Sequence, residues 1–546
     1  MSYPSTGERR GVNHKLIQKL WQAAAHSELV QTISSLRGDG GRLLALGDTS
    51  LRPLYRDEIA QLESQGNSSP DWSRVRVVDG FDYRRIHRSS FHGDVVLGRC
   101  TRQVKLAEGF ELPAGIYQST LVNCIIGPDV LIRDVKLLAN YAVCENAVLF
   151  DCSAITCEGK TRFGNGAELP LGIESGGREV AVFAEIDVET AASVACSRAC
   201  HAFQKEYRQA VGDYAAQVES SRGLIGPGAI VRATPRVRNT YVGAAAQIDG
   251  ATLIADSTIL SNAEEPVRIE SGACVSRSLL QWGTRVATLG VVERSVLTEH
   301  SHVEQHGKVA DSLLGPNSTV ESGEVTASLV GPFVNMHHQA LLIATLWPEG
   351  KGNVSYGVNA GSNHTSRAPD QEFRPGEGAF LGLGVSVKFP ADFTQAPYLV
   401  VASATTLLPQ KICFPFSLVN APAVQYPDVS PAYNQIIPAW LLTDNLFALK
   451  RNESKFRARN RARRTTFAFE VLRPDMVDLM RDAYRRLAAV RQPKEIYTDR
   501  DIEGLGKSFL LEAHRVAAMV AYQYFVRYYG LLALKDEVAG AVNGSA

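Results

Sequence analysis

The sequence predicts a mainly β protein: a left-handed parallel β-helix, or hexapeptide-repeat solenoid, with a helical N-terminal cap, a helical insertion and an α-helical C-terminal region. The first observation is an apolar ladder in which every sixth residue matches: Ile126, Ile132, Leu138, Cys144 and Phe150. This period fits neither an amphipathic helix, which repeats every 3.6 residues, nor a strand, which alternates every two. It is typical of solenoids in which each hexad forms one flat side of a triangular coil.

Two further observations extend the ladder. The sixfold spacing returns at later apolar positions: Ile225, Val231 and Val237; Val242, Ile248, Ile254 and Leu260; Val303 and Val309; Leu314 and Val320; Leu381, Val387, Phe393 and Leu399. A tripeptide of one apolar residue, Gly and Pro marks several coils, at 126–128, 225–227, 314–316 and 330–332. The two signals together predict coils from about residue 95 to about residue 415.

Around the coils, the apolar pattern divides the chain into five segments. Residues 1–72 are expected to form a helical segment that covers the first coil, because the ends of a solenoid need covering. Residues 73–187 form the first part of the β-helix, and 188–222 form a helical insertion. Residues 223–415 form the second part of the β-helix and contain a polar site loop. Residues 416–546 contain a linker, a basic segment and C-terminal helices.

The helical insertion carries an apolar stripe at helical spacing: Tyr207, Val211, Tyr214 and Val218. Two interpretations stay open. The helix either packs on the outside of the coils or forms a lid over a groove.

The basic segment 450–464 is the strongest charge feature of the chain. Its alternating arginines would line one face of a strand: Arg457, Arg459, Arg461 and Arg463. Such a run either forms a solvated face, paired with acidic residues of the same protein, or binds a phosphorylated ligand or nucleic acid. Nucleic acid is disfavoured, because Phe456 is the only aromatic residue inside the run.

The composition of the chain limits the cellular location and the binding partners that we expect. The chain has 57 basic and 57 acidic residues, so no global field points to nucleic acid or to an acidic partner. Residues 1–13 lack the apolar core of a signal peptide, and Val516–Leu534 contains Gln523 and Arg527, which disfavours a membrane span. Nine cysteines without a Cys-x-x-Cys pair indicate reduced thiols. We therefore expect a cytoplasmic protein with no membrane span.

The region from Met336 to Lys388 interrupts the coils with a high density of ionisable side chains. It can supply a base, an anion clamp and carboxylates that orient them. The candidate catalytic residues are His364, His338 and Asp370. The candidate substrate-binding residues are Asn363, Arg367, Glu372, Lys388, His337 and, from an earlier loop, Arg178. The alternative is a structural loop whose charges satisfy one another.

The apolar-Gly-Pro hexads resemble those of bacterial hexapeptide-repeat acyltransferases and of the solenoid domains of sugar-nucleotide pyrophosphorylases. Three stretches, Gly361–Glu372, Ala448–Phe456 and Ile496–Lys507, more closely resemble an uncharacterised bacterial family of long hexapeptide-repeat proteins of unknown function. That resemblance implies the fold and no established reaction. The glycine-rich catalytic loop of the pyrophosphorylases is missing from the N-terminal segment, which disfavours nucleotidyl transfer.

The resemblance to the acyltransferases implies acyl transfer from an acyl-thioester donor to a sugar or sugar-nucleotide acceptor, with His364 as general base. It also implies acyl-CoA as a co-substrate, no tightly bound cofactor, and a homo-oligomer, with a trimer favoured. The alternative is a non-catalytic solenoid that binds a sugar phosphate or nucleotide, or that scaffolds partners.

A third hypothesis is a metal hydratase. His300, His302 and His306 resemble the ligands of the γ-class carbonic anhydrases. Here, however, His302 and His306 are four residues apart, where that family has five, and the upstream histidine is absent. We therefore expect no metal site.

Overall fold

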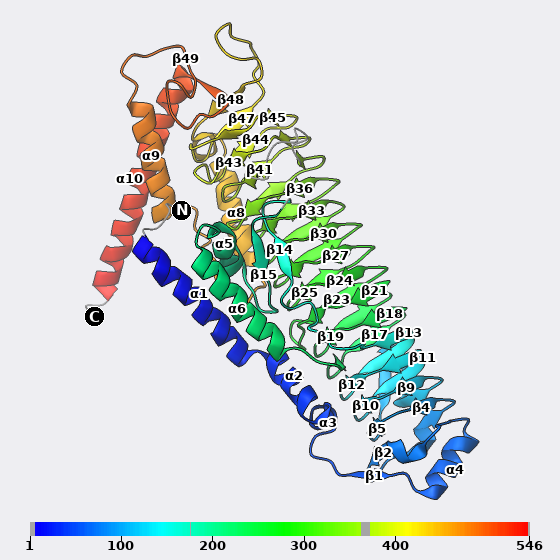
Figure 1. The fold of residues 1–546 in the computed structure, drawn as a ribbon. Coiled ribbons are helices and arrows are strands. Elements are labelled where there is room, and N and C mark those ends of the chain that lie inside the picture. The colour runs from blue at the N-terminus through cyan, green and yellow to red at the C-terminus, as the bar shows by residue number, and fades with distance from the viewer. Residues whose placement is uncertain (1–5, 175, 362–371, 544–546) are drawn as a thin grey trace. The chain divides into compact units, whose positions relative to one another are not determined.

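The computed structural model describes residues 6–174, 176–361 and 372–543. They group into two compact units. The N-terminal unit contains 2–169 and 179–313, and the C-terminal unit contains 170–178 and 314–546. In both units short parallel strands stack turn upon turn into a β-solenoid, so the protein is mainly β (Figure 1).

Each turn of the N-terminal unit contributes one strand, or one half of a long strand, to each of three stacks. The first stack contains β2 (Val75–Val78), β5 (Val95–Leu97), β10 (Ile125–Ile126), β12 (Tyr141–Val143), β16 (Gly223–Ile225), β19 (Tyr241–Val242), β22 (Thr258–Ile259), β25 (Leu279–Leu280) and β28 (Val296–Leu297). The second contains β3 (Ile86–His87), β8 (Gly115–Tyr117), the first halves of β11 (Leu131–Ala139) and β13 (Val148–Thr156), β17 (Ile230–Arg232), β20 (Gln247–Asp249), β23 (Arg268–Glu270), β26 (Arg285–Val286) and β29 (His302–Glu304). The third contains β4 (Ser90–His92), β9 (Thr120–Val122), the second halves of β11 and β13, β18 (Arg236–Arg238), β21 (Leu253–Ala255), β24 (Cys274–Ser276), β27 (Val291–Glu293) and β30 (Lys308–Ala310).

The strand register corrects the predicted ladder at Cys144 and Phe150, because Ile126 pairs with Val143 and not with Cys144. Ile132 pairs with Leu149, and Val231 pairs with Ile248, so these turns add 17 residues each rather than three full hexads. One of its three steps therefore has five residues, and this short step explains why the ladder reappears out of phase. Leu149 is fully buried, whereas Phe150 is half-exposed.

The Gly-Pro tripeptides mark places where successive turns approach closely. A Cβ atom on Gly127 would lie 2.8 Å from the backbone nitrogen of Glu145 in the next turn. Only glycine fits such an approach, so the tripeptide is a stacking requirement of the coil.

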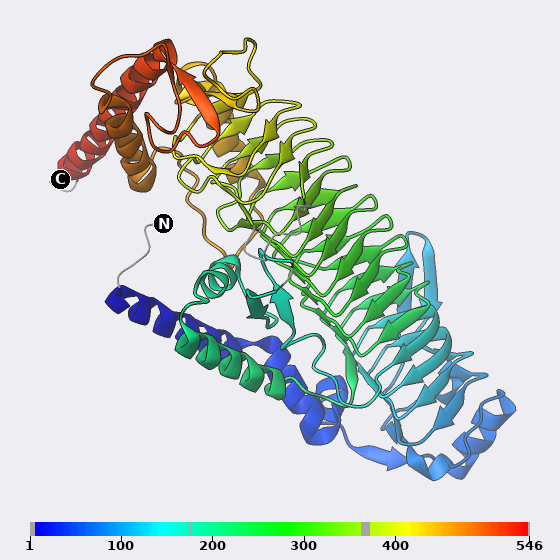
Figure 2. The same ribbon diagram turned by 45° about the horizontal axis from the view of Figure 1, so that its top comes forward.

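Helices cover the outside of the first stack in the N-terminal unit. They are α1 (Thr6–His26), α2 (Glu28–Asp39), α3 (Arg42–Leu46), α5 (Val188–Cys196) and α6 (His201–Gln217), while α4 (Arg56–Ser64) lies beside the first turns. Figure 2 shows α6 running alongside α1. The predicted stripe of α6 is completely buried, and Tyr214 donates a hydrogen bond of 2.6 Å to Glu185. The insertion therefore packs through its apolar stripe, as the packing interpretation expects.

The C-terminal unit repeats the three stacks. The first contains β34 (Leu329–Val330) and β37 (Leu346–Trp347) and is followed by β40 (Phe373–Arg374), β43 (Ala391–Asp392) and β46 (Gln410–Lys411). The second contains β32 (Thr319–Glu321), β35 (Asn335–Met336), β38 (Asn353–Val354), β41 (Phe380–Leu381), β44 (Val400–Val401) and β47 (Leu418–Asn420). The third contains β33 (Glu324–Thr326), β36 (Leu341–Ile343), β39 (Asn359–Ala360), β42 (Ser386–Val387) and β45 (Thr406–Leu407).

The last turn is covered by the C-terminal segment. Strand β48 (Asn434–Ile437) pairs antiparallel with β47 and parallel with β50 (Ser508–Leu511), and β49 (Ile496–Tyr497) pairs with β50. This pairing occupies the open strand edge that a solenoid end would otherwise present. The helices of this region are α7 (Trp440–Thr443), α8 (Leu446–Arg459), α9 (Pro474–Ala488) and α10 (Glu512–Asn543).

The structure corrects the prediction of a strand through the basic segment. Leu449 and Phe456 lie seven residues apart and are both buried, so apolar packing selects a helix, α8, up to Arg459. Within the described ranges, no helix is both long and apolar enough to cross a membrane.

Candidate functional site

Two adjacent histidines lie at the corner between the second and third stacks of the C-terminal unit. Strand β35 ends with the buried Met336, so His337 points outward, and His338 turns the corner with a φ of 58°. Because Val320 pairs with Met336, Glu321 and His337 are neighbours in adjacent turns. Nδ1 of His337 lies 3.1 Å from Oε2 of Glu321, and the two side chains are 34% and 27% exposed.

This pair has the geometry of an oriented base. A carboxylate at Nδ1 favours the tautomer that carries its proton there, so Nε2 holds the lone pair that accepts a proton from a substrate. The exposed ring of His338 lies 5.9 Å from that of His337, which places a second imidazole beside the first. Glu321 was not among the predicted site residues.

Lys388 lies at the opposite edge of the third-stack face. The outward side chains of this face, Leu341, Asn359, Ser386 and Thr406, stand in register on four successive turns. His338 precedes the face at one edge, and the exposed Lys388 follows β42 at the other. These two predicted residues therefore lie at opposite edges of the same face and on different turns of the coil.

Arg178 and Glu372 come together, but as a structural pair. Nη2 of Arg178 lies 3.0 Å from Oε1 and 2.9 Å from Oε2 of Glu372, and Arg374 donates to the same carboxylate at 2.6 Å. Arg178 is only 7% exposed, and the backbone nitrogen of Gly172 donates to the carbonyl of Ala327 at 2.8 Å. We therefore assign this pair to fastening loop 170–178 onto the coil, as the structural alternative expects. The other predicted residues, Asn363, His364, Arg367 and Asp370, lie outside the described residues.

A buried ionic cluster surrounds Glu377. Its carboxylate accepts hydrogen bonds from Lys351 Nζ at 2.9 Å, Tyr398 Oη at 2.8 Å and Arg473 Nη1 at 3.1 Å. Burial alone would raise the pKa of Glu377, but hydrogen bonds from Arg473 and the charge of Lys351 hold it below its usual range. Lys351 also donates to the carbonyl of Ala468, so the cluster attaches the segment 468–473 to the coils.

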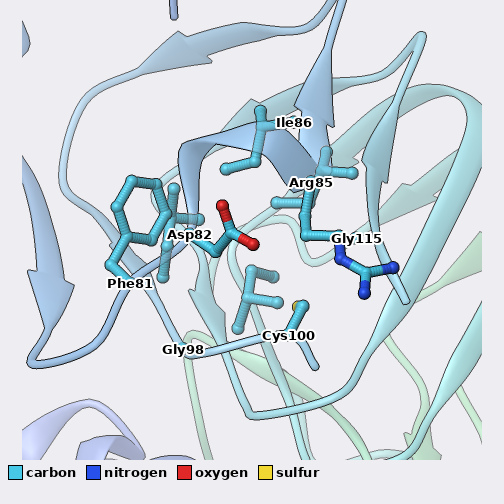
Figure 3. Close-up of a pocket in the computed structure, with 10 residues that line it drawn as sticks. Phe81, Asp82, Arg85, Ile86, Gly98, Cys100 and Gly115 are labelled. Atoms are coloured by element: carbon cyan, nitrogen blue, oxygen red, sulfur yellow. The ribbon is translucent and has the colours of Figure 1, made fainter. Parts of the chain in front are cut away.

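A small apolar pocket lies among the first turns of the N-terminal unit. The inward side chains Ile86, Leu97, Ile116 and Ile126 line it, and Figure 3 shows Asp82 and Cys100 turned toward its middle. Burial raises the pKa of the Cys100 thiol to about 12, so this cysteine is no nucleophile at neutral pH. Asp82 is engaged by Nε of Arg84 at 2.8 Å. The pocket is best explained as a packing gap.

The histidines of the metal hypothesis are paired with carboxylates instead. Nε2 of His300 lies 3.0 Å from Oε1 of Glu265, and Nδ1 of His302 lies 3.8 Å from Oε1 of Glu304. Over the part of the chain that the structure describes, no group of three or more His, Cys, Asp or Glu side chains is arranged to hold a metal ion.

Comparison with known proteins adds a family. A family model described as "Domain of unknown function (DUF4954)" matches residues 51–367, a range that includes Glu321 and His337. An "Uncharacterized protein" of Treponema pallidum (strain Nichols) is 28% identical over 451 residues, which cover 79% of this chain and 60% of the relative. The chain thus spans about 60% of the length of this curated relative.

Proposed function

Because this chain belongs to the DUF4954 family, which is defined by a domain of unknown function, we propose an activity from the site itself: acyl transfer from an acyl-thioester donor to a sugar or sugar-nucleotide acceptor. In this proposal the coils are those of a left-handed hexapeptide solenoid. The enzyme acts in the cytoplasm, where acyl-CoA is available, as a homo-oligomer in which a trimer is favoured.

One observation carries the proposal. The Glu321–His337 pair stands half-exposed at a coil corner, with Nδ1 held by a carboxylate and Nε2 left to act on a substrate. A general base needs this combination of access and orientation. Arg178, which sequence analysis assigned to substrate binding, is buried against Glu372, and the proposal gives it no role.

The reaction balances without a covalent enzyme intermediate. Nε2 of His337 takes the proton of the acceptor hydroxyl or amine as its oxygen or nitrogen attacks the thioester carbonyl. The carbon–sulfur bond then breaks, and the leaving thiolate takes the proton back from the imidazolium. Glu321 stabilises that imidazolium, as the carboxylate does in other His–carboxylate pairs. In this proposal His338, beside His337, and Lys388, at the far edge of the same face, hold the acceptor and its phosphates.

The test is turnover by the purified protein. Acetyl-CoA and longer acyl-CoAs are incubated with a set of nucleotide sugars, and free thiol and acceptor mass are measured. His337→Ala should lower turnover by roughly 10²- to 10⁴-fold while the melting curve stays unchanged. His300→Ala is the matched control, because His300 also pairs with a glutamate but lies in the N-terminal unit.

Two other outcomes decide between the alternatives. If His364→Ala abolishes turnover and His337→Ala does not, the base predicted from sequence replaces His337. If nucleotide sugars bind and no acyl group moves with any donor, the transferase is excluded and the non-catalytic binding solenoid takes its place.

A further inference from the structure

Helix α8 carries cations on two flanks, and among the described residues only one flank forms ion pairs with carboxylates. On the first flank, Lys450 Nζ lies 3.5 Å from Oε2 of Glu453, and Arg457 Nη2 lies 2.7 Å from Oε1 of Glu470. These contacts are what a basic segment makes when its charges are balanced within its own protein.

The second flank is a strip of three cations without such partners. Arg451, Lys455 and Arg459 recur every four residues, so they share one side of the helix. Among the described carboxylates, none forms an ion pair with any of the three. Partial burial, and then repulsion from Arg459 and Arg451, lower the pKa of Lys455. We call these three residues the basic strip.

Like charges at this spacing repel one another and destabilise a helix. The chain nevertheless holds the strip in place. Phe456 packs on Phe333 with ring centroids 5.2 Å apart, and Asn317 Nδ2 donates to Asn460 Oδ1 at 3.0 Å. These contacts hold the helix against the coil. The repulsion among the three cations of the basic strip would be relieved by a bound anion, and we call the helix with its strip the platform.

The platform adjoins the candidate site. Phe333, on which α8 packs, is followed by β35 and then by His337, four residues later in the chain. At about 3.3 Å per extended residue, their Cα atoms are at most roughly 13 Å apart. An elongated ligand can therefore reach from the helix to the Glu321–His337 pair.

We propose that the basic strip binds the phosphate groups of the nucleotide portion of an acyl-CoA donor, a proposal that rests on the transferase function above. Arginine forks and a lysine ammonium suit phosphate oxyanions, and several phosphates on one ligand require several cations. The flexible pantetheine arm then carries the thioester toward His337. Single-stranded nucleic acid fits less well, because α8 offers a single exposed ring beside the strip, Phe447 at 73% exposure, whereas Phe456 is 7% exposed and is not available for base stacking.

The test measures binding of unacylated coenzyme A by calorimetry to the full-length protein. The triple variant Arg451→Gln, Lys455→Gln, Arg459→Gln should bind roughly 100-fold more weakly, since each exposed charge contact is worth about fivefold in affinity. The matched control is the double variant Lys450→Gln, Arg457→Gln, which removes the paired cations and should change the affinity by less than about twofold. Melting curves verify that both variants fold.

The remaining outcomes separate this proposal from the proposed function. If the triple variant binds coenzyme A as tightly as the wild type, the proposal that the strip binds the phosphates is overturned, even if the protein transfers acyl groups. If coenzyme A binding depends on the strip but no acyl group is transferred, the coenzyme A site is supported and the transferase function is excluded. Binding of an oligothymidylate with no binding of coenzyme A overturns the proposal in favour of nucleic acid.

Discussion

Oε2 of Glu321 lies 3.1 Å from Nδ1 of His337, on adjacent turns of the same coil corner. The contact joins a carboxylate at the end of β32 to an imidazole on the residue directly after β35. It fixes the ring and its tautomer from outside the ring's own strand, which makes Glu321 a positioning residue for the proposed base.

Replacing Glu321 tests this coupling. Glu321→Gln preserves shape but removes the charge, so we expect turnover to fall at least about tenfold with little change in KM. Steady-state kinetics of the two single variants and of Glu321→Gln/His337→Ala check the result. If the residues act as a unit, the double variant is no slower than His337→Ala. Additive losses would contradict the coupling.

The register of the coil predicts a difference between neighbouring residues. Leu149 points inward and is completely buried, so Leu149→Asp should lower the free energy of unfolding by at least about 3 kcal/mol. Phe150→Ser should cost far less, because Phe150 is half-exposed. Ile132→Asp is the positive control, since both the hexad pattern and the structure place it inward. Urea unfolding measures all three, and an equal loss at 149 and 150 would contradict the 17-residue turn.

Glu377 makes part of the stability acid-sensitive. Because its folded-state pKa is lowered, its contribution is present above the unfolded value, about 4.3, and is lost as pH falls through the folded value. We expect Glu377→Gln to cost about 3–5 kcal/mol at pH 7, because Lys351 and Arg473 lose their shared partner. Urea unfolding between pH 7 and pH 3 should show this cost shrinking toward acid pH. A cost independent of pH would contradict the assignment.

Self-association should involve α10. Its outer face carries exposed apolar side chains at helical spacing: Val516, Val520, Tyr524, Tyr528 and Leu531. An opposite face, with Ala518, Tyr522 and Phe525, is already buried. A helix that is apolar on both sides is normally covered on both, here by further copies of the chain. Light scattering should give a trimer for the wild type and a smaller mass for Val520→Glu, with Lys535→Glu as control. A wild-type mass of 59.4 kDa would exclude self-association.

The amino-acid sequence by itself determined the solenoid and the helical stripe of α6. Inward apolar side chains recur at short, regular intervals in the sequence, so their period can be recognised without knowing which strands pair. The same local evidence failed where packing decided. Alternating arginines suggested a strand, but the buried Leu449 and Phe456 select the helix α8. The sixfold pattern predicted Phe150 as an inward residue, but the inward residue is Leu149. The pattern alone does not reveal that one corner of the turn is a residue shorter.

Only the tertiary structure decided which charges meet. Arg178 and Glu372 are 194 positions apart in the chain, and their ion pair follows from how a loop returns to the coil. Glu321 and His337 are neighbours because β32 and β35 pair in one particular register. A shift of that register by one residue would turn His337 inward and separate the pair. The histidines proposed as bases were thus identifiable from their residue type, whereas the carboxylate that contacts one of them depends on strand pairing that no local pattern encodes.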